Sequence, residues 1–306
     1  MSARANKASR MLFIRSALVR FAVDGATQAA LTVCPLGTLA MTSVSRFPRA
    51  AWLPLLMMTT GLFSACSSGR PKDASKQALA QHDLGVDAFS KGNLRGALTH
   101  ARKAVELDDE NADAQLLVAT VLVGFCAYSP DECHLDEAEK AARAALKVKP
   151  DFREARNTLG SVLINEKKYA DAIATLKPLT EDMLYATPEI AWGNLGWAQL
   201  ENGDADSAIT SLKRAMALQP QFCWGGLKLA LAYEKKGDLG TAEVTVTKAI
   251  DTDKPQCKAF PDLFEVRARV RQKLGDGIGA KEDLERCKKV GEGTPAGRRC
   301  AAGGGS

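Results

Sequence analysis

The chain is 306 residues long, 25% of it charged and 6% aromatic, with a formal net charge of +5 at pH 7. The positive excess lies in residues 1–65, which hold seven Lys or Arg against a single acid, Asp24, so the remainder is close to neutral. No basic surface of the kind that attracts nucleic acid is left, and no nucleic-acid partner is expected.

Residues 1–65 are predicted to lie outside the folded domain. Arg46 and Arg49 precede a 14-residue apolar run, from Ala50 to Phe63. This run is too short for a comfortable transmembrane helix and is typical of the apolar core of a signal peptide. A start at Met41 would give a signal spanning 41–65, and we expect residues 1–40 to reflect a mis-assigned start rather than a genuine extension.

The apolar run ends in Leu62-Phe63-Ser64-Ala65-Cys66, which resembles a bacterial lipobox, with Phe63 where the family prefers Leu. The resemblance implies cleavage before Cys66 and a covalent lipid on its thiol; the alternative is a chance cysteine after an apolar run. Several acyl chains, such as palmitate, would anchor the protein stably to a membrane. Because Ser67 and not Asp follows Cys66, the resemblance implies the periplasmic face of the outer membrane. Residues 66–77 are polar and are predicted to form a flexible tether.

Small residues recur periodically in the region 78–290. One series has intervals of 41, 34, 36, 34 and 38 residues: Ala97, Ala138, Ala172, Ala208, Ala242 and Ala280. A second small residue stands twelve positions earlier in five of the six units: Gly85, Gly160, Gly196, Ala230 and Ala268. In the second unit the spacing from Ala119 is 19, which predicts a turn that is seven residues longer.

The stretch from Pro188 to Pro220 shows the repeating unit most fully. Trp192, Leu195, Gly196 and Leu200 follow one predicted helix, Asn202-Gly203-Asp204 breaks it, and Ala208, Leu212 and Ala215 follow a second helix. The pattern resembles the tetratricopeptide (TPR) repeat, whose period is about 34 residues. The resemblance implies an all-α superhelix of about six helix–turn–helix repeats over 78–290, followed by a C-terminal tail, 291–306.

Six cysteines fall in the repeats and the tail, which in principle allows 15 pairings. Cys126 and Cys133 bracket the longer turn, and Cys223 and Cys257 flank the fifth helical hairpin, whose ends lie side by side. Cys287 and Cys300 remain, and their bridge would pin the tail onto the last helix. Each bridge would stabilise the fold by roughly 2–4 kcal/mol. The alternatives are free buried thiols or, less favoured, a zinc site at Cys126, Cys133 and His134, which lacks a suitably spaced fourth ligand.

The chain carries no recognisable catalytic motif in a suitable structural context. Its three histidines, His82, His100 and His134, are isolated from one another in the sequence. We therefore expect no enzyme, no cofactor apart from the lipid on Cys66, no metal and no small-molecule substrate.

Function is then expected on a binding surface, since stacked TPR units present the first helix of each repeat on a concave face. The largely apolar set suits an amphipathic helix or an extended segment of a protein partner, although single members could instead be inter-repeat core. The residues predicted to face this groove are Val86, Phe89, Leu116, Thr120, Val123, Asn157, Ile164, Trp197, Leu200, Trp224, Leu227 and Leu231.

Two segments carry a closer resemblance. Leu184–Pro188 followed by Trp192–Gly196 is similar to the junction in pilotins of type IV pilus systems, the PilF/PilW type, and Gln221–Cys223 with Ala232–Gly237 is similar to their Tgl branch. The resemblance implies a lipoprotein that escorts secretin subunits to the outer membrane and promotes their assembly into a ring. The cysteine-bracketed insertion departs from the pattern. The alternatives are a general periplasmic TPR lipoprotein that serves outer-membrane protein assembly or cell-wall enzymes, and an enzyme, for which no side-chain constellation is found.

Overall fold

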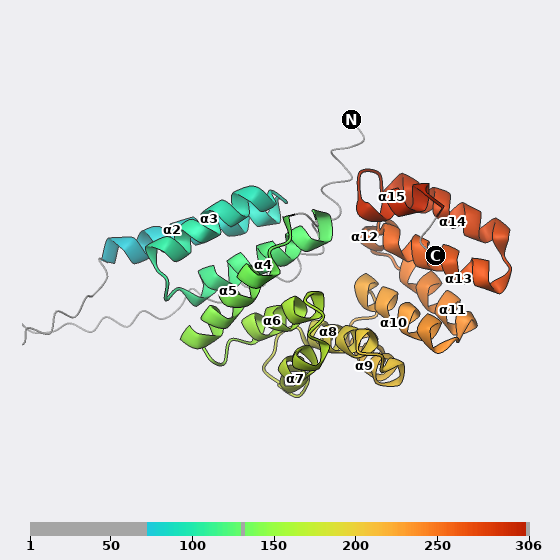
Figure 1. Cartoon of the computed structure of the whole chain (residues 1–306), viewed down its shortest axis with the longest axis horizontal. Helices are drawn as coiled ribbons and strands as arrows, with labels where there is room; N and C mark the ends of the chain where they lie inside the picture. Colours follow the sequence, from blue (N-terminus) through green and yellow to red (C-terminus); the bar gives the residue numbers. More distant parts are fainter. Residues whose placement is uncertain (1–71, 130–131, 304–306) are drawn as a thin grey trace, which may run out of the picture.

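The computed structural model describes residues 72–129 and 132–303. The predicted signal peptide, the lipobox with Cys66 and the residues around it lie outside the described residues. Six antiparallel helical hairpins follow one another along the chain (Figure 1), each built from consecutive helices: α2 (Lys72–Ser90) and α3 (Leu94–Leu107), α4 (Ala112–Tyr128) and α5 (Leu135–Val148), α6 (Arg153–Asn165) and α7 (Tyr169–Thr180), α8 (Pro188–Glu201) and α9 (Ala205–Leu218), α10 (Cys223–Lys236) and α11 (Leu239–Ile250), α13 (Pro261–Leu274) and α14 (Gly277–Val290).

Two short helices stand outside the hairpin pattern. The first, α12 (Pro255–Lys258), lies between the fifth and sixth hairpins, and the second, α15 (Pro295–Ala301), follows the sixth. Figure 1 shows the hairpins arranged along a curve, so that α12 and α15 face the early helices across the open side of the superhelix. Within the part of the chain that is described, no helix is both long enough and apolar enough to cross a bilayer.

The small residues of the repeat explain how closely the paired helices approach. The alanines that open the second helices are all buried, from 0% exposed at Ala97 to 5% at Ala280. On the first helices, a Cβ added at Gly160 would clash with Leu176, and one added at Gly196 would lie 2.5 Å from Cγ of Leu212. The recurring small residues therefore permit close contact between the backbones of the paired helices.

The turns of four hairpins share one local pattern, in which a glycine with positive φ ends the first helix and the next side chain caps the second. In the fourth hairpin, Gly203 has φ 94°, and Asp204 then accepts a hydrogen bond from the N–H of Ser207. The third hairpin departs from this pattern, because the residue with positive φ is Lys167, at φ 62°, and the side chain of Lys168 after it makes no cap. That conformation is unfavourable for a residue with a Cβ.

Three boundaries differ from the sequence-based expectation. Helix α2 begins at Lys72, inside the segment predicted to be a flexible tether. The fifth and sixth hairpins do not follow each other directly, because Pro255 begins α12 between them, which accounts for the longer spacing before the sixth unit. The predicted tail contains α15, and Cys300 within it is 4% exposed. Proline at the first helical position favours a helix start, which explains both short helices.

Candidate partner-binding site

Most of the residues predicted to face the groove are partly exposed on the first helix of their hairpin. This group comprises Val86, Leu116, Thr120, Val123, Asn157, Trp197, Trp224 and Leu231. Asn157 on α6 accepts a hydrogen bond from Asn194 Nδ2 on α8 at 3.0 Å, which ties two neighbouring first helices together. These side chains are placed where a partner could reach them.

Four members of the predicted set need correction. Phe89, Ile164, Leu200 and Leu227 are between 2% and 6% exposed and belong to the inter-repeat core. A helix in a solenoid packs against its own partner and against both neighbouring repeats, so its apolar stripe is wider than its concave edge. The position of one small residue on each helix therefore does not determine which neighbouring side chains face the groove. Phe89 differs from the other three because it also borders the cavity described next.

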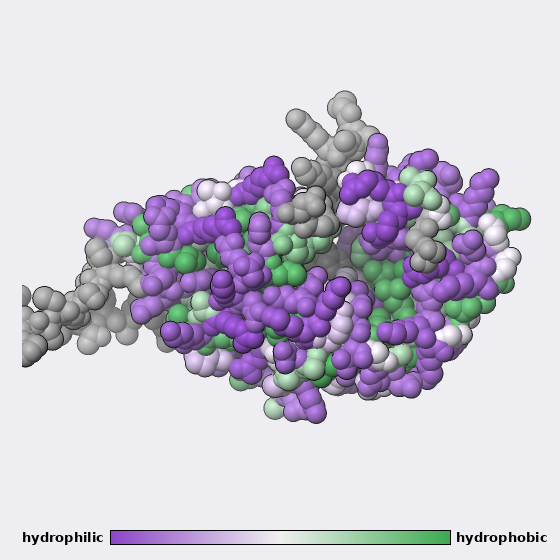
Figure 2. All heavy atoms as spheres, viewed as in Figure 1, coloured by the Kyte–Doolittle hydropathy of each residue, from purple (hydrophilic) through white to green (hydrophobic). Residues whose placement is uncertain are grey.

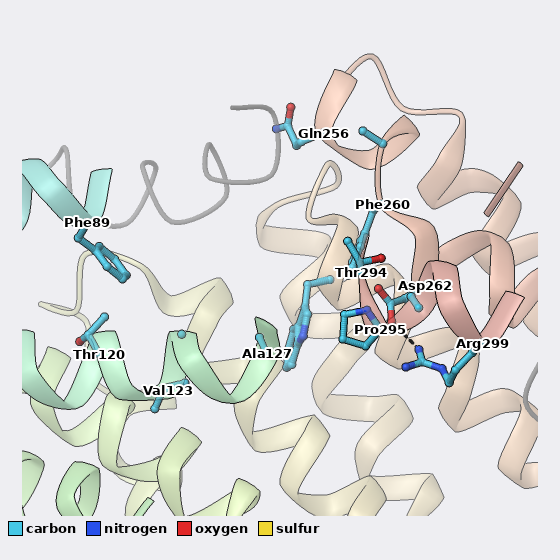
Figure 3. Close-up of a pocket in the computed structure, with 14 residues that line it drawn as sticks. Phe89, Thr120, Val123, Ala127, Gln256, Phe260, Asp262, Thr294, Pro295 and Arg299 are labelled. Atoms are coloured by element: carbon cyan, nitrogen blue, oxygen red, sulfur yellow. Dashed lines mark hydrogen bonds and ion pairs between the residues drawn. The ribbon is translucent and has the colours of Figure 1, made fainter. Parts of the chain in front are cut away.

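A cavity of about 420 Å³ lies on the open side of the superhelix. One wall comes from the early helices, with Phe89 of α2 and Thr120 and Val123 of α4. The opposite wall comes from the late ones, with Phe260 just before α13 and Pro295 of α15, and Figure 3 shows the two sets facing each other. Figure 2 shows apolar side chains gathered in a hollow beside α10 and α12.

The two tryptophans of the predicted groove pack against each other. Trp197 of α8 and Trp224 of α10 have ring centroids 5.4 Å apart and ring planes at 81° to each other. This is an edge-to-face arrangement, which aromatic pairs favour. Phe222 extends the cluster, with its ring 5.8 Å from that of Trp224. Because Trp224 also borders the cavity, the aromatic cluster and the cavity form one continuous surface.

Sequence reasoning missed the cation of this surface, Lys228. Its Nζ lies 4.3 Å from the centroid of the Trp197 ring and 5.5 Å from that of Trp224, within the range of cation–π attraction. Burial lowers the pKa of Lys228 to about 8, although the charges of Glu201 and Asp262 act in the opposite direction. The signal was present in the sequence, since residues 224 and 228 are one helical turn apart and share a face.

The late wall of the cavity is held by charge and by a covalent link. Arg299 of α15 donates two hydrogen bonds to Glu265 of α13, at 2.7 and 2.6 Å, and a third to Asp262 at 3.1 Å. Glu265 is the main reason why the pKa of Arg299 is raised. The adjacent Cys300 is bonded to Cys287 of α14, with Cα atoms 6.0 Å apart. Because this segment was predicted as a tail, Arg299 and Pro295 were missed as site residues.

All three predicted disulfides are present in the structure. Cys126–Cys133 closes the longer turn, with Cα atoms 4.5 Å apart, and Cys223–Cys257 joins α10 to α12 over 5.3 Å. The alternatives of free thiols and of a zinc site are therefore wrong for these cysteines. Across residues 72–129 and 132–303, no group of His, Cys, Asp and Glu is positioned to hold a metal ion.

These features define a tetratricopeptide-repeat solenoid, a class whose members typically act as protein-interaction modules. Models of the tetratricopeptide repeat match residues 134–182 and 190–222. More particularly, the chain is homologous to the type IV pilus assembly protein PilF of Pseudomonas aeruginosa. The two are 30% identical over 146 residues, which cover 47% of this chain and 54% of that relative. The chain thus spans about half the length of this curated relative.

Solved structures show the same fold. The crystal structure of PilW, described as a widely conserved type IV pilus biogenesis factor, has a TM-score of 0.60 at 23% identity, with 73% of this chain and 98% of that one covered. The structure of Pseudomonas aeruginosa PilF has a TM-score of 0.54 at 20% identity and covers 76% and 100%. The TPR superhelix predicted from the repeat spacing is confirmed.

Proposed function

We propose that this protein acts in type IV pilus biogenesis as a pilotin, an outer-membrane lipoprotein that promotes the targeting and multimer assembly of secretin subunits. Homology to the pilus assembly protein PilF is the observation that carries this proposal. The concave aromatic surface and the adjoining cavity are suited to hold a segment of the partner, since a few clustered aromatic side chains dominate many protein interfaces.

Membrane attachment is the second part of the proposal. The lipobox-like Leu62-Phe63-Ser64-Ala65-Cys66 supports a lipid on Cys66, and Ser67 supports sorting to the outer membrane. Mass spectrometry of the mature protein should find an acylated N-terminal Cys66, and a Cys66→Ser variant should leave the membrane fraction. An unmodified product that keeps residues 1–65 would overturn this part.

The decisive experiment deletes the gene in its own bacterium and follows secretin multimers that resist heating in detergent. We expect the multimers to disappear while the secretin monomer remains, and the wild-type gene to restore them. A groove variant, Trp224→Ala, should restore them poorly, whereas Leu218→Ala, which removes an exposed apolar side chain from the second helix α9, serves as the control. If multimers form normally after the deletion, the pilotin proposal is wrong, and the alternative of a general periplasmic scaffold for outer-membrane protein assembly or cell-wall enzymes replaces it.

A further inference from the structure

Lys228 differs from the partly buried arginines of the late helices. Arg267, Arg269 and Arg271 each have a carboxylate partner, as in Arg267 with Asp283 at 2.7 Å and Arg269 with Glu234 at 2.8 Å. Within the described residues, Lys228 has only the two tryptophan rings beside its Nζ. A half-buried ammonium without an anion is costly for a folded protein. Such a group is a candidate for pairing with an anion supplied from outside.

Both acids that favour the charged form of Lys228 are engaged with other donors. Glu201 of α8 accepts a hydrogen bond from Trp197 Nε1 at 3.1 Å, and Asp262 of α13 accepts one from Arg299 at 3.1 Å. Neither lies within ion-pair distance of the Lys228 ammonium in the structure. An incoming carboxylate would therefore meet a cation that no direct contact neutralises.

The surface continues on both sides of Lys228. On one side the concave face runs through Trp197 to the Asn194–Asn157 link between α8 and α6, and on the other Trp224 leads into the apolar cavity. A chain lying along this path would cross the lysine in its middle. The expected contact is thus with an internal side chain of the partner and not with its terminus.

We propose that the concave face around Lys228 recognises a partner segment in which an acidic side chain is flanked by bulky apolar residues. The Lys228 ammonium pairs with the carboxylate, and Trp197 and Trp224 pack against the flanking side chains. The inference rests on the proposed function only in that the concave face binds a protein segment. It specifies the chemistry of that segment.

An unbiased selection tests the proposal. Short random peptides are displayed in two formats, one with both ends joined to the carrier and one with a free carboxyl terminus, and are selected on the immobilised mature protein. We expect the first format to yield Asp or Glu next to Leu, Phe or Trp. Enrichment in the free-terminus format alone would overturn the proposal in favour of capture of a terminal carboxylate. Selection without an acidic preference, or failure to select any peptide, would also overturn it.

A double-mutant cycle then assigns the contact. Changing the selected Glu to Gln in the peptide should weaken binding to the wild-type protein by about tenfold, the loss expected for one charge-assisted hydrogen bond. The same change should have little effect on binding to Lys228→Gln, and Lys228→Arg should restore the preference. Equal losses on wild type and Lys228→Gln would contradict the assignment.

Lys213→Gln is the matched control for this cycle. The Lys213 Nζ lies 5.7 Å from the centroid of the Tyr233 ring, but the side chain is exposed on α9, a second helix away from the concave face. It should bind like wild type, and circular dichroism should show that all the variants are folded. The outcome is independent of the pilotin test, since secretin multimers could need the protein even if Lys228→Gln had no effect on peptide binding.

Discussion

The early and late halves of the superhelix are held together by different means. In the first two hairpins the ion pairs lie on the surface, as in Arg95 with Glu132, whose side chains are 79% and 39% exposed. In the sixth hairpin Asp283 is 4% exposed and accepts hydrogen bonds from both Arg267 and Arg271. Exposed pairs add little to stability, whereas a buried carboxylate that serves two guanidiniums is tightly coupled to its surroundings.

The disulfides of the early and late halves also differ. Cys126–Cys133 in the second hairpin spans a separation of seven and closes only its own turn. In the late half, Cys223–Cys257 spans 34 residues and Cys287–Cys300 spans 13, and these bridges fix α12 and α15 beside the cavity. The comparison indicates a late wall that is fixed by covalent and buried ionic links, and an early wall that depends on nearest-neighbour packing.

Among the variants that test this comparison, Asp283→Ala should cause the largest loss of stability. Removing the carboxylate leaves Arg267 and Arg271 partly buried without it, so the free energy of unfolding should fall by about 3 kcal/mol or more. Glu132→Ala breaks the exposed pair of the early half and should cost much less, because solvent screens an exposed ion pair. Urea denaturation followed by circular dichroism measures both. Similar losses would remove the distinction between the halves.

The next largest loss of stability is expected when both Cys223 and Cys257 are changed to Ala. Because the bridge closes a 34-residue separation, its loss should lower the free energy of unfolding by about 3 kcal/mol. The equivalent change at Cys126 and Cys133 should cost less, since a shorter loop constrains the unfolded chain less. Thermal melts of the two variants beside wild type provide the test, and a larger loss at Cys126–Cys133 would contradict it.

Much of the repeat region could be predicted because each helical hairpin obeys local rules. The spacing of Ala97, Ala138 and the later alanines depends on close helix packing, which leaves a periodic signal in the sequence. The pair Cys223–Cys257 followed from the hairpins, because antiparallel helices bring the ends of one unit together. Cys126–Cys133 followed from the longer turn that they bracket, and Cys287–Cys300 were the two cysteines that remained.

The site was predicted less well because it depends on contacts between distant units. Arg299 reaches Glu265 only because α15 folds back onto α13, and no periodic pattern marks a single short helix after the last repeat. Lys228 carries no motif, and its surroundings come from α8, α10 and α13 together. The curvature that brings Phe89 opposite Phe260 accumulates over many small rotations between repeats, which local spacing does not specify.

Lys228→Met tests whether the concave face carries a stability cost for its proposed function. Burial lowers the pKa of Lys228 to about 8, whereas an unfolded lysine titrates at about 10.4. The unfolded state therefore binds more protons between these values, and wild-type stability should rise through this group as pH increases from about 8 to about 10.4. The variant should be more stable than wild type near pH 7, by on the order of 1–2 kcal/mol, with a difference that shrinks toward pH 10.

The control for that prediction is Lys213→Met, which removes an ammonium that is exposed on α9. Urea midpoints near pH 7 and near pH 10 supply the comparison. A Lys228→Met variant that is less stable than wild type at both pH values would show that the ammonium stabilises the fold, and the concave face would then carry no such cost.

The smallest expected effect lies in the early half, at the turn of the third hairpin. Lys167 is exposed and has φ 62°, where the matching position of the fourth hairpin is Gly203 with φ 94°. Lys167→Gly should raise the free energy of unfolding by about 0.5–1 kcal/mol, since relief of the left-handed strain exceeds the added entropy of the unfolded chain. Gly203→Ala should lower the free energy of unfolding by about 1 kcal/mol. The cause is the positive φ and not a steric clash, because a Cβ there meets no atom within 4 Å.

Hydrogen exchange resolved by segment should place the stability gained by Lys167→Gly in α6 and α7, because a repeat without a crosslink transmits stability mainly to its neighbours. A gain spread evenly to α13 and α14 would mean that the superhelix unfolds as one unit and that its two halves are not separate in stability.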